Sequence, residues 1–258
     1  MRSDLLVLVK EGCCGGVCVG SKTLRCTVKV LAYADPTTGR FSSEKVKLVW
    51  FAKENCSRRG YGFDFDKYGI YKVRVRKHST DDAQYLLVKI LSRRVHHPEL
   101  DALREQYKKP VSLETPLGPF TLDRSFSWFE NNINLKNGNT EIYLETDTED
   151  GDTAEKALAI FCKICGSLDE FEQNVRLAAA DELLECANDW LADCCEEGDE
   201  PEIITREGFA ERIGLESISI APDGEITIYY DDDDIFLGHS IVVTADSSGN
   251  VSDAILMG

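Results

Sequence analysis

Apolar and polar residues alternate through much of the first hundred positions of the chain. Residues 24–30 and 71–77 each place every second residue on one apolar face, a pattern typical of a half-buried β-strand. Residues 45–51 and 84–91 are further apolar runs, and a short helix that opens at Pro98 follows them. Five or so strands closed by one helix predict a small antiparallel β-barrel, and the oligonucleotide-binding (OB) type is one form of such a barrel.

Beyond residue 110 the pattern changes to strands, then helices, then strands again. Apolar segments predict the first strands at 117–124, 126–133 and 140–145. Capping-box patterns at 152–155 and 167–170 predict the starts of two helices, each with an apolar stripe of helical period. The last four strands are predicted at 216–221, 225–230, 238–245 and 251–257. This order predicts an α+β domain in which helices pack on one face of an antiparallel sheet.

The charge of the chain divides at the same point as the pattern. Residues 1–109 hold 22 Lys and Arg against 12 Asp and Glu, so 22 − 12 = +10. Residues 110–258 hold 7 against 34, so 7 − 34 = −27, and the two sums give the net −17. We therefore predict a basic β-rich domain at 1–109 and an acidic α+β domain at 110–258, each long enough to bury its own core.

The N-terminal residues and the cysteines indicate a cytoplasmic protein. The apolar run 5–9 is too short for a secretory core, and Asp4 stands where a signal peptide would be positive. No stretch approaches the roughly 20 apolar residues that cross a bilayer, so we expect no membrane association. The 10 cysteines are then expected to be reduced thiols.

Two groups of cysteines could in principle bind a metal. Cys13, Cys14 and Cys18 lack the usual CxxC spacing, so a glycine-rich hairpin or strand is favoured there, with zinc as the alternative. Cys162 and Cys165 form a CxxC pair on the apolar stripe of a predicted helix, which core packing explains. We expect neither a metal nor a cofactor.

A basic stripe is the most prominent feature of the first domain. Lys72, Arg74 and Arg76 project together from the polar face of one predicted strand, with aromatic residues nearby. Cations beside aromatic rings can bind single-stranded nucleic acid. A solvated strand face is the favoured interpretation, because the acidic half makes the whole chain a poor attractor for phosphate. Docking of the stripe onto the acidic half is a third interpretation.

A polar cluster near the end of the chain is the best candidate for chemistry. It comprises Tyr229, Asp231, Asp233 and His239. The acidic run 231–234 fails the EF-hand spacing, so a charged hairpin tip is favoured over a calcium site. Asp233 could orient His239 as a general base, but no nucleophile motif accompanies them. We therefore assign no catalytic residue.

Parts of the second domain resemble a bacterial family, the domain of unknown function 2262. The resemblance rests on segments 117–124, 188–190, 218–224, 235–241 and 249–258, of which the Phe-x-Gly-His-x-Ile element is the most specific. It implies a bacterial intracellular protein with no established activity. Similar acidic domains look like those encoded among toxin-immunity proteins, which bind and neutralise a partner.

These observations favour a non-enzymatic interaction protein whose acidic domain docks a protein partner with a basic surface. The expected contacts are the acidic residues at 231–234 together with Glu196, Glu197, Asp199 and Glu200. Two alternatives stay open. One is a single-stranded nucleic-acid module on Lys72, Arg74 and Arg76, and the other is an enzyme built around His239.

Overall fold

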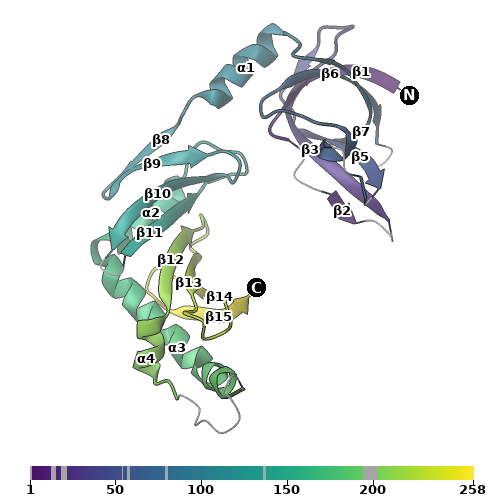
Figure 1. Ribbon diagram of the computed structural model, residues 1–258. Coiled ribbons are helices and arrows are strands. Elements are labelled where there is room, and N and C mark those ends of the chain that lie inside the picture. The colour runs from purple at the N-terminus through teal and green to yellow at the C-terminus, as the bar shows by residue number, and fades with distance from the viewer. Residues whose placement is uncertain are drawn as a thin grey trace. The chain divides into compact units, whose positions relative to one another are not determined.

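The computed structural model describes residues 2–12, 16–18, 22–53, 55–56, 59–78, 81–135, 138–193 and 203–258, with the backbone alone described at 16–18. The chain forms two compact units, Met1–Lys109 and Pro110–Gly258. Figure 1 shows a barrel in the first unit and a long sheet with helices in the second. The predicted α+β class, with a barrel followed by a helix-covered sheet, is confirmed.

The first unit is a closed five-stranded barrel. Its strands are β1 (Arg2–Val9), β3 (Thr23–Ala34), β5 (Val46–Lys53), β6 (Ile70–Lys77) and β7 (Gln84–Arg93). They are bonded in the order β1-β6-β7-β5-β3, and pairing of β1 with β3 closes the ring. All neighbours are antiparallel except β5 and β7, which are parallel. This is the strand order of an OB-type barrel. The short strands β2 (Gly16–Cys18) and β4 (Phe41–Ser42) pair with β3, and a 3-10 turn, η1 (Arg59–Gly62), follows β5.

The barrel wall is apolar on both sides along β1. Leu5, Val7 and Val9 face the interior, where the predicted strand residues Tyr71, Val73 and Val75 are also buried. The intervening Leu6 and Leu8 face outward and pack under Leu100 of α1 (Pro98–Lys108). The uninterrupted apolar run 5–9 is therefore a strand buried on both faces.

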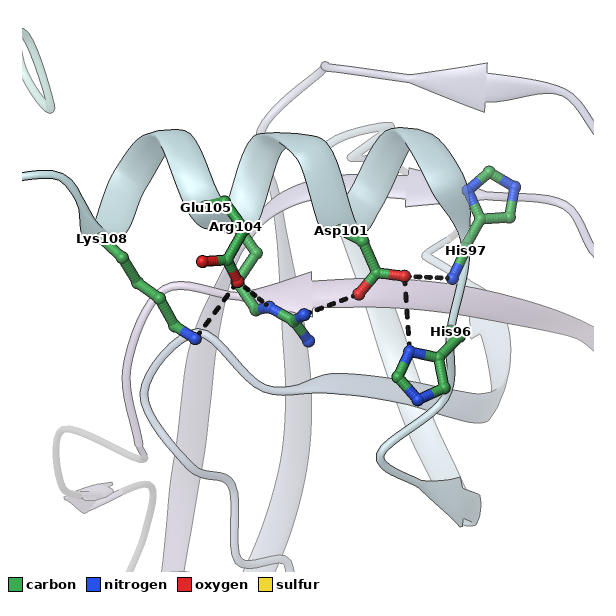
Figure 2. A network of polar contacts seen from close by, with 6 residues as sticks. All are labelled: His96, His97, Asp101, Arg104, Glu105 and Lys108. Carbon is green, nitrogen blue, oxygen red and sulfur yellow. Dashed lines mark hydrogen bonds and ion pairs between the residues drawn. The ribbon is translucent and has the colours of Figure 1, made fainter.

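A polar network fixes the start of α1 (Figure 2). The backbone N–H of His97 donates to the carboxylate of Asp101 at 2.9 Å, and the Arg104 guanidinium lies 2.8 Å from the other carboxylate oxygen. The His96 ring nitrogen Nδ1 lies 3.6 Å from the same carboxylate. Asp101 thus satisfies a backbone donor that would otherwise be unpaired at the helix entrance.

The second unit is an eight-stranded sheet built from two meanders. The first meander is β8 (Ser112–Thr115), β9 (Gly118–Asp123), β10 (Trp128–Leu135) and β11 (Gly138–Glu145). The second is β12 (Gly214–Ile220), β13 (Ile226–Asp231), β14 (Ser240–Ala245) and β15 (Val251–Met257). The strands lie in sequence order across the sheet, and only β11 and β12 are parallel. A parallel connection needs a long crossover, which the helices supply.

The crossover helices cover one face of this sheet (Figure 1). They are α2 (Glu155–Ile164), the 3-10 turn η2 (Cys165–Ser167), α3 (Leu168–Asp193) and α4 (Arg206–Arg212). Phe161, Val175 and Ala179 on the helices share one core cluster with Phe129 and Ile228 on the strands. None of the helices in the described ranges is long and apolar enough to cross a membrane.

Two details of α2 differ from the sequence prediction. The predicted capping box at 152–155 is wrong, because Ala154 is the N-cap and its side chain makes no cap bond. The carboxylate of Asp147 accepts from the N–H groups of Glu155 and Lys156 instead. Cys162 is exposed rather than on the buried stripe, which runs through Ala157, Phe161 and Ile164.

Candidate functional site

The sheet of the second unit leaves one face without a covering helix among the described residues. We call this surface the open face. Cross-strand pairing aligns its side chains in two rows that run across β10 to β14. One row is Glu130, Tyr143, Ser219, Thr227 and Thr244, and the next is Asn132, Glu141, Ser217, Tyr229 and Val242. All of these side chains are exposed or half-buried except that of Val242.

Three aromatic rings are stacked at one end of the open face. The Phe126 ring lies parallel to that of Trp128, with centroids 4.6 Å apart and an interplanar angle of 11°. Trp128 in turn contacts Tyr143 with centroids 4.4 Å apart. Phe126 is 64% exposed, although aromatic side chains gain most free energy when they are buried. The stack therefore presents one exposed ring, that of Phe126, beside the half-buried rings of Trp128 and Tyr143.

Three carboxylates surround this stack. The Trp128 indole N–H donates to Glu130 at 3.0 Å, the Tyr143 hydroxyl donates to Glu141, and the Ser219 hydroxyl donates to Glu145 at 3.4 Å. Burial, followed by the hydrogen bond to Glu141, raises the pKa of Tyr143 well above its usual range, so the phenol keeps its proton and donates. Each carboxylate has a neutral donor, which leaves its negative charge in place.

No cation offsets these carboxylates within the sheet. The eight strands, as the structure bounds them, contain neither Lys nor Arg. In the described part of the chain, none of Glu130, Glu141 and Glu145 forms an ion pair. The open face therefore carries uncompensated negative charge beside one exposed and two half-buried aromatic rings.

A hollow lies on the open face over β9, β10 and β11. Its volume is about 290 Å³, and it is lined by Thr121, Glu130, Asn131, Asn132, Glu141 and Tyr143. Two of the three carboxylates and one ring of the stack thus border the same depression.

The predicted polar cluster is divided between two places in the structure. Tyr229 lies on the open face and Asp231 ends the same strand, β13, while Asp233 and His239 lie in the connection between β13 and β14. Asp233 binds the Arg212 guanidinium at 2.7 Å, whereas the His239 Nδ1 lies 2.5 Å from the carbonyl oxygen of Phe236. Both side chains are therefore engaged elsewhere, and the structure does not bring them together as a general-base pair.

The acidic run at 231–234 has a structural role at this turn. Asp232 was expected to contact a partner together with the rest of this run, but its side chain is 2% exposed and therefore cannot do so. Its carboxylate accepts from the N–H groups of Phe236 at 2.7 Å and Gly238 at 3.1 Å. Asp231 accepts from the N–H of Asp233 at 3.0 Å. No group of His, Cys, Asp or Glu in the described ranges is arranged to hold a metal ion.

The predicted basic stripe lies on the outer wall of β6. Arg74 forms a two-point ion pair with Asp4 of β1, at 2.8 Å from Nε and 3.1 Å from Nη2. Hydrogen bonding to Arg74 lowers the pKa of the Asp4 carboxyl. Arg76 is exposed and Lys72 is half-buried. The charge of the stripe is thus partly offset at its centre.

Some predicted residues lie outside the described part of the chain. These are Cys13 and Cys14, the side chain of Cys18, and the acidic residues Glu196, Glu197, Asp199 and Glu200.

Sequence reasoning missed the aromatic and acidic residues of the open face. Trp128 and Glu130 share the outward face of one strand, and Glu141, Tyr143 and Glu145 share that of the next. The available signal was the alternation itself, because the outward positions of both strands combine aromatic rings with carboxylates and contain no cation.

Comparison with known proteins yields two family models, both of unknown function. Residues 2–107 match the domain of unknown function DUF7021, and residues 114–256 match the family described as "Uncharacterized protein conserved in bacteria (DUF2262)". No curated protein and no solved structure matches the chain significantly. The second match covers more than half of the 258 residues. The chain therefore belongs to the DUF2262 family of bacterial proteins.

Proposed function

We propose that this is a non-enzymatic interaction protein whose acidic domain binds a basic protein partner through the open face. The observation that carries the proposal is the combination, on one uncovered sheet surface, of carboxylates without counter-cations and a group of aromatic rings of which Phe126 is exposed. An immunity-type role, in which the domain neutralises a basic partner, is one form of this function.

The physical chemistry of association supports this assignment. Complementary charge steers a basic partner toward the face and raises the rate of encounter. Aromatic side chains supply most of the binding free energy at the centre of protein interfaces, because they bury large area with little loss of conformational freedom. The stack of Phe126, Trp128 and Tyr143 provides such a centre, and Glu130, Glu141 and Glu145 surround it.

The test compares two triple variants with the same change in net charge. Glu130, Glu141 and Glu145 are replaced by Gln in one, and the exposed Glu170, Glu182 and Glu185 of α3 in the other. Proteins captured from a lysate of the source bacterium at low salt are identified, and the affinity of each purified candidate is then measured. We expect the open-face variant to lose binding and the α3 variant to keep it. Equal losses in both variants would show that net charge alone, and not this face, attracts the partner.

A second candidate function is single-stranded nucleic-acid binding by the barrel. On the outer wall, Lys29 lies opposite Lys47, and Arg25 lies opposite Phe51, which is 58% exposed. Cations beside an exposed ring can hold phosphates and stack on bases, and β3 and β5 are the second and third barrel strands, where OB-type barrels bind oligonucleotides. The net charge of −17 opposes this function, so it ranks second.

Oligonucleotide titrations of the full chain at low salt would distinguish two basic surfaces of the barrel, one on β3 and β5 and the other on β6. One variant carries Gln at Lys29 and Lys47, and a matched variant carries Gln at Lys72 and Arg76. Loss of binding in the first variant alone would place the nucleic acid on β3 and β5. No binding by the wild-type chain at low salt would remove this function.

A further inference from the structure

The hollow on the open face brings two like charges to one aromatic ring. Glu130 lies directly opposite Tyr143 on the neighbouring strand, and Glu141 precedes Tyr143 by two residues, so it projects from the same face. Glu130 and Glu141 are therefore diagonal cross-strand neighbours, about 7–8 Å apart. Like charges at this separation repel each other. A cation between them would remove this repulsion.

The chemistry of the lining favours a guanidinium over an ammonium group. A guanidinium is planar, is weakly hydrated, has five N–H donors and stacks on aromatic faces. The hollow is lined by two carboxylates, Glu130 and Glu141, and the Tyr143 ring, together with the polar side chains of Thr121 and Asn132. An ammonium group is a compact, strongly hydrated point charge, so its transfer from water to the hollow costs more free energy, and it has no planar face to stack on the Tyr143 ring.

The neighbouring stack suits the rest of an arginine side chain. The Trp128 ring contacts Tyr143 on one side and Phe126 on the other, which makes a continuous apolar wall next to the hollow. Long basic side chains lay their methylene stems along such surfaces while their charged heads bind polar groups. The wall and the hollow together match the two parts of one arginine.

We propose that the hollow bounded by Glu130, Glu141 and Tyr143 receives an arginine side chain of the basic partner. This inference rests on the proposed function, since it names the chemical group that the open face recognises. It adds a specific ligand class, a guanidinium on a flexible stem, to the broader attraction between opposite charges.

The test uses the full chain and two small probes, N-acetyl-arginine amide and N-acetyl-lysine amide. Binding is followed by nuclear magnetic resonance of the tryptophan indole N–H groups, of which the chain has 3. The Trp128 indole donates to Glu130 and so reports on the hollow, while Trp50 and Trp190 serve as internal controls of folding. We expect arginine amide to shift the Trp128 signal saturably and to bind roughly two- to fivefold tighter than lysine amide.

Variants then locate the site. The double variant Glu130→Gln, Glu141→Gln should abolish the shift of the Trp128 signal. The double variant Glu182→Gln, Glu185→Gln on α3 should preserve it. Equal binding of the two probes would overturn the arginine preference. Absence of any Trp128 shift would overturn the hollow as a site. Either result leaves the proposed function standing if the open-face triple variant still loses its protein partner, so the two failures can be told apart.

Discussion

Arg176 and Glu172, one turn apart on α3, form an ion pair inside the core of the acidic domain. The Arg176 Nε lies 2.7 Å from the Glu172 carboxylate, and the two side chains are 6% and 3% exposed. A second guanidinium nitrogen donates to the carbonyl oxygens of Ala210 at 3.0 Å and Ile213 at 2.6 Å. The guanidinium also lies over the Tyr230 ring. Arg176 thus satisfies carbonyl groups at the end of α4 and joins α3 to α4 and β13.

Replacement of Arg176 by Met should destabilise the acidic domain by about 3–5 kcal/mol, because it leaves a buried carboxylate without a partner. Urea unfolding followed by far-ultraviolet circular dichroism measures the change. The double variant Arg176→Met, Glu172→Gln should lose less stability than Arg176→Met alone, because it also removes the buried charge that has lost its partner. Arg206, which pairs with Asp181 at the surface, is the matched control. Replacement of Arg206 by Met should lower the free energy of unfolding by no more than about 1 kcal/mol. An equal loss from both single variants would contradict the role given to Arg176.

Asp147 gives a prediction with a defined pH dependence. Burial raises the pKa of its carboxyl, but hydrogen bonds from the N–H groups of Lys156 and Glu155 lower it by more, so it lies below the usual 3.8. A carboxyl with a depressed folded-state pKa stabilises the protein above its unfolded pKa, and this stabilisation is lost as the pH falls through the folded pKa. Ala at Asp147 should therefore cost about 1 kcal/mol at neutral pH, as expected for a lost helix cap.

The difference between wild type and this variant should shrink as the pH falls below 3.8. Unfolding free energies measured across that range test the trend. Asp152, which the sequence pattern named as the cap, is the control, and Ala there should have little effect. A cost at Asp147 that did not change with pH would argue against a charged cap.

The sequence predicted strands and helices well where one face of an element meets a core. Period-two alternation at 71–77 placed Tyr71, Val73 and Val75 in the barrel interior, where all three are buried. It could not predict the buried Glu172 and Arg176, because charged residues are ordinarily assigned to solvent. Their burial depends on carbonyl groups of α4, which lie more than thirty positions away in the sequence.

The sequence could not predict the open face for a different reason. Alternation shows which residues of a strand point outward, but not which residues of other strands lie beside them. Glu130 meets Tyr143 only through the register of β10 and β11, and Tyr143 meets Ser219 only through the parallel pairing across the helical crossover. Register of this kind follows from the whole sheet.

Asp101 should stabilise the barrel unit through the start of α1. Ala at this position removes the acceptor of the His97 N–H and the partner of Arg104, so we expect a loss of about 1 kcal/mol. Trp50 is the single tryptophan of residues 1–109, so its indole N–H signal in nuclear magnetic resonance, separate from those of Trp128 and Trp190, reports unfolding of the barrel. Ala at Glu105, an exposed member of the same network, is the control. If Asp101→Ala and Glu105→Ala shift the midpoint of unfolding equally, the hydrogen bond from the His97 N–H to Asp101 is not the stabilising contact.

Asp232 and Asp234 should behave differently although they belong to one acidic run. The Asp232 carboxylate holds the N–H groups of Phe236 and Gly238, and Phe236 packs against Trp190 and Phe209. Ala at Asp232 leaves these two N–H donors without their acceptor and should cost about 1–3 kcal/mol. Asp234 is exposed with φ of 59°, a left-handed conformation that Asn also adopts, so Asn there removes the same charge at little cost. Thermal unfolding of both variants tests the contrast, and a turn that served only as a charged surface would show equal stability in the two.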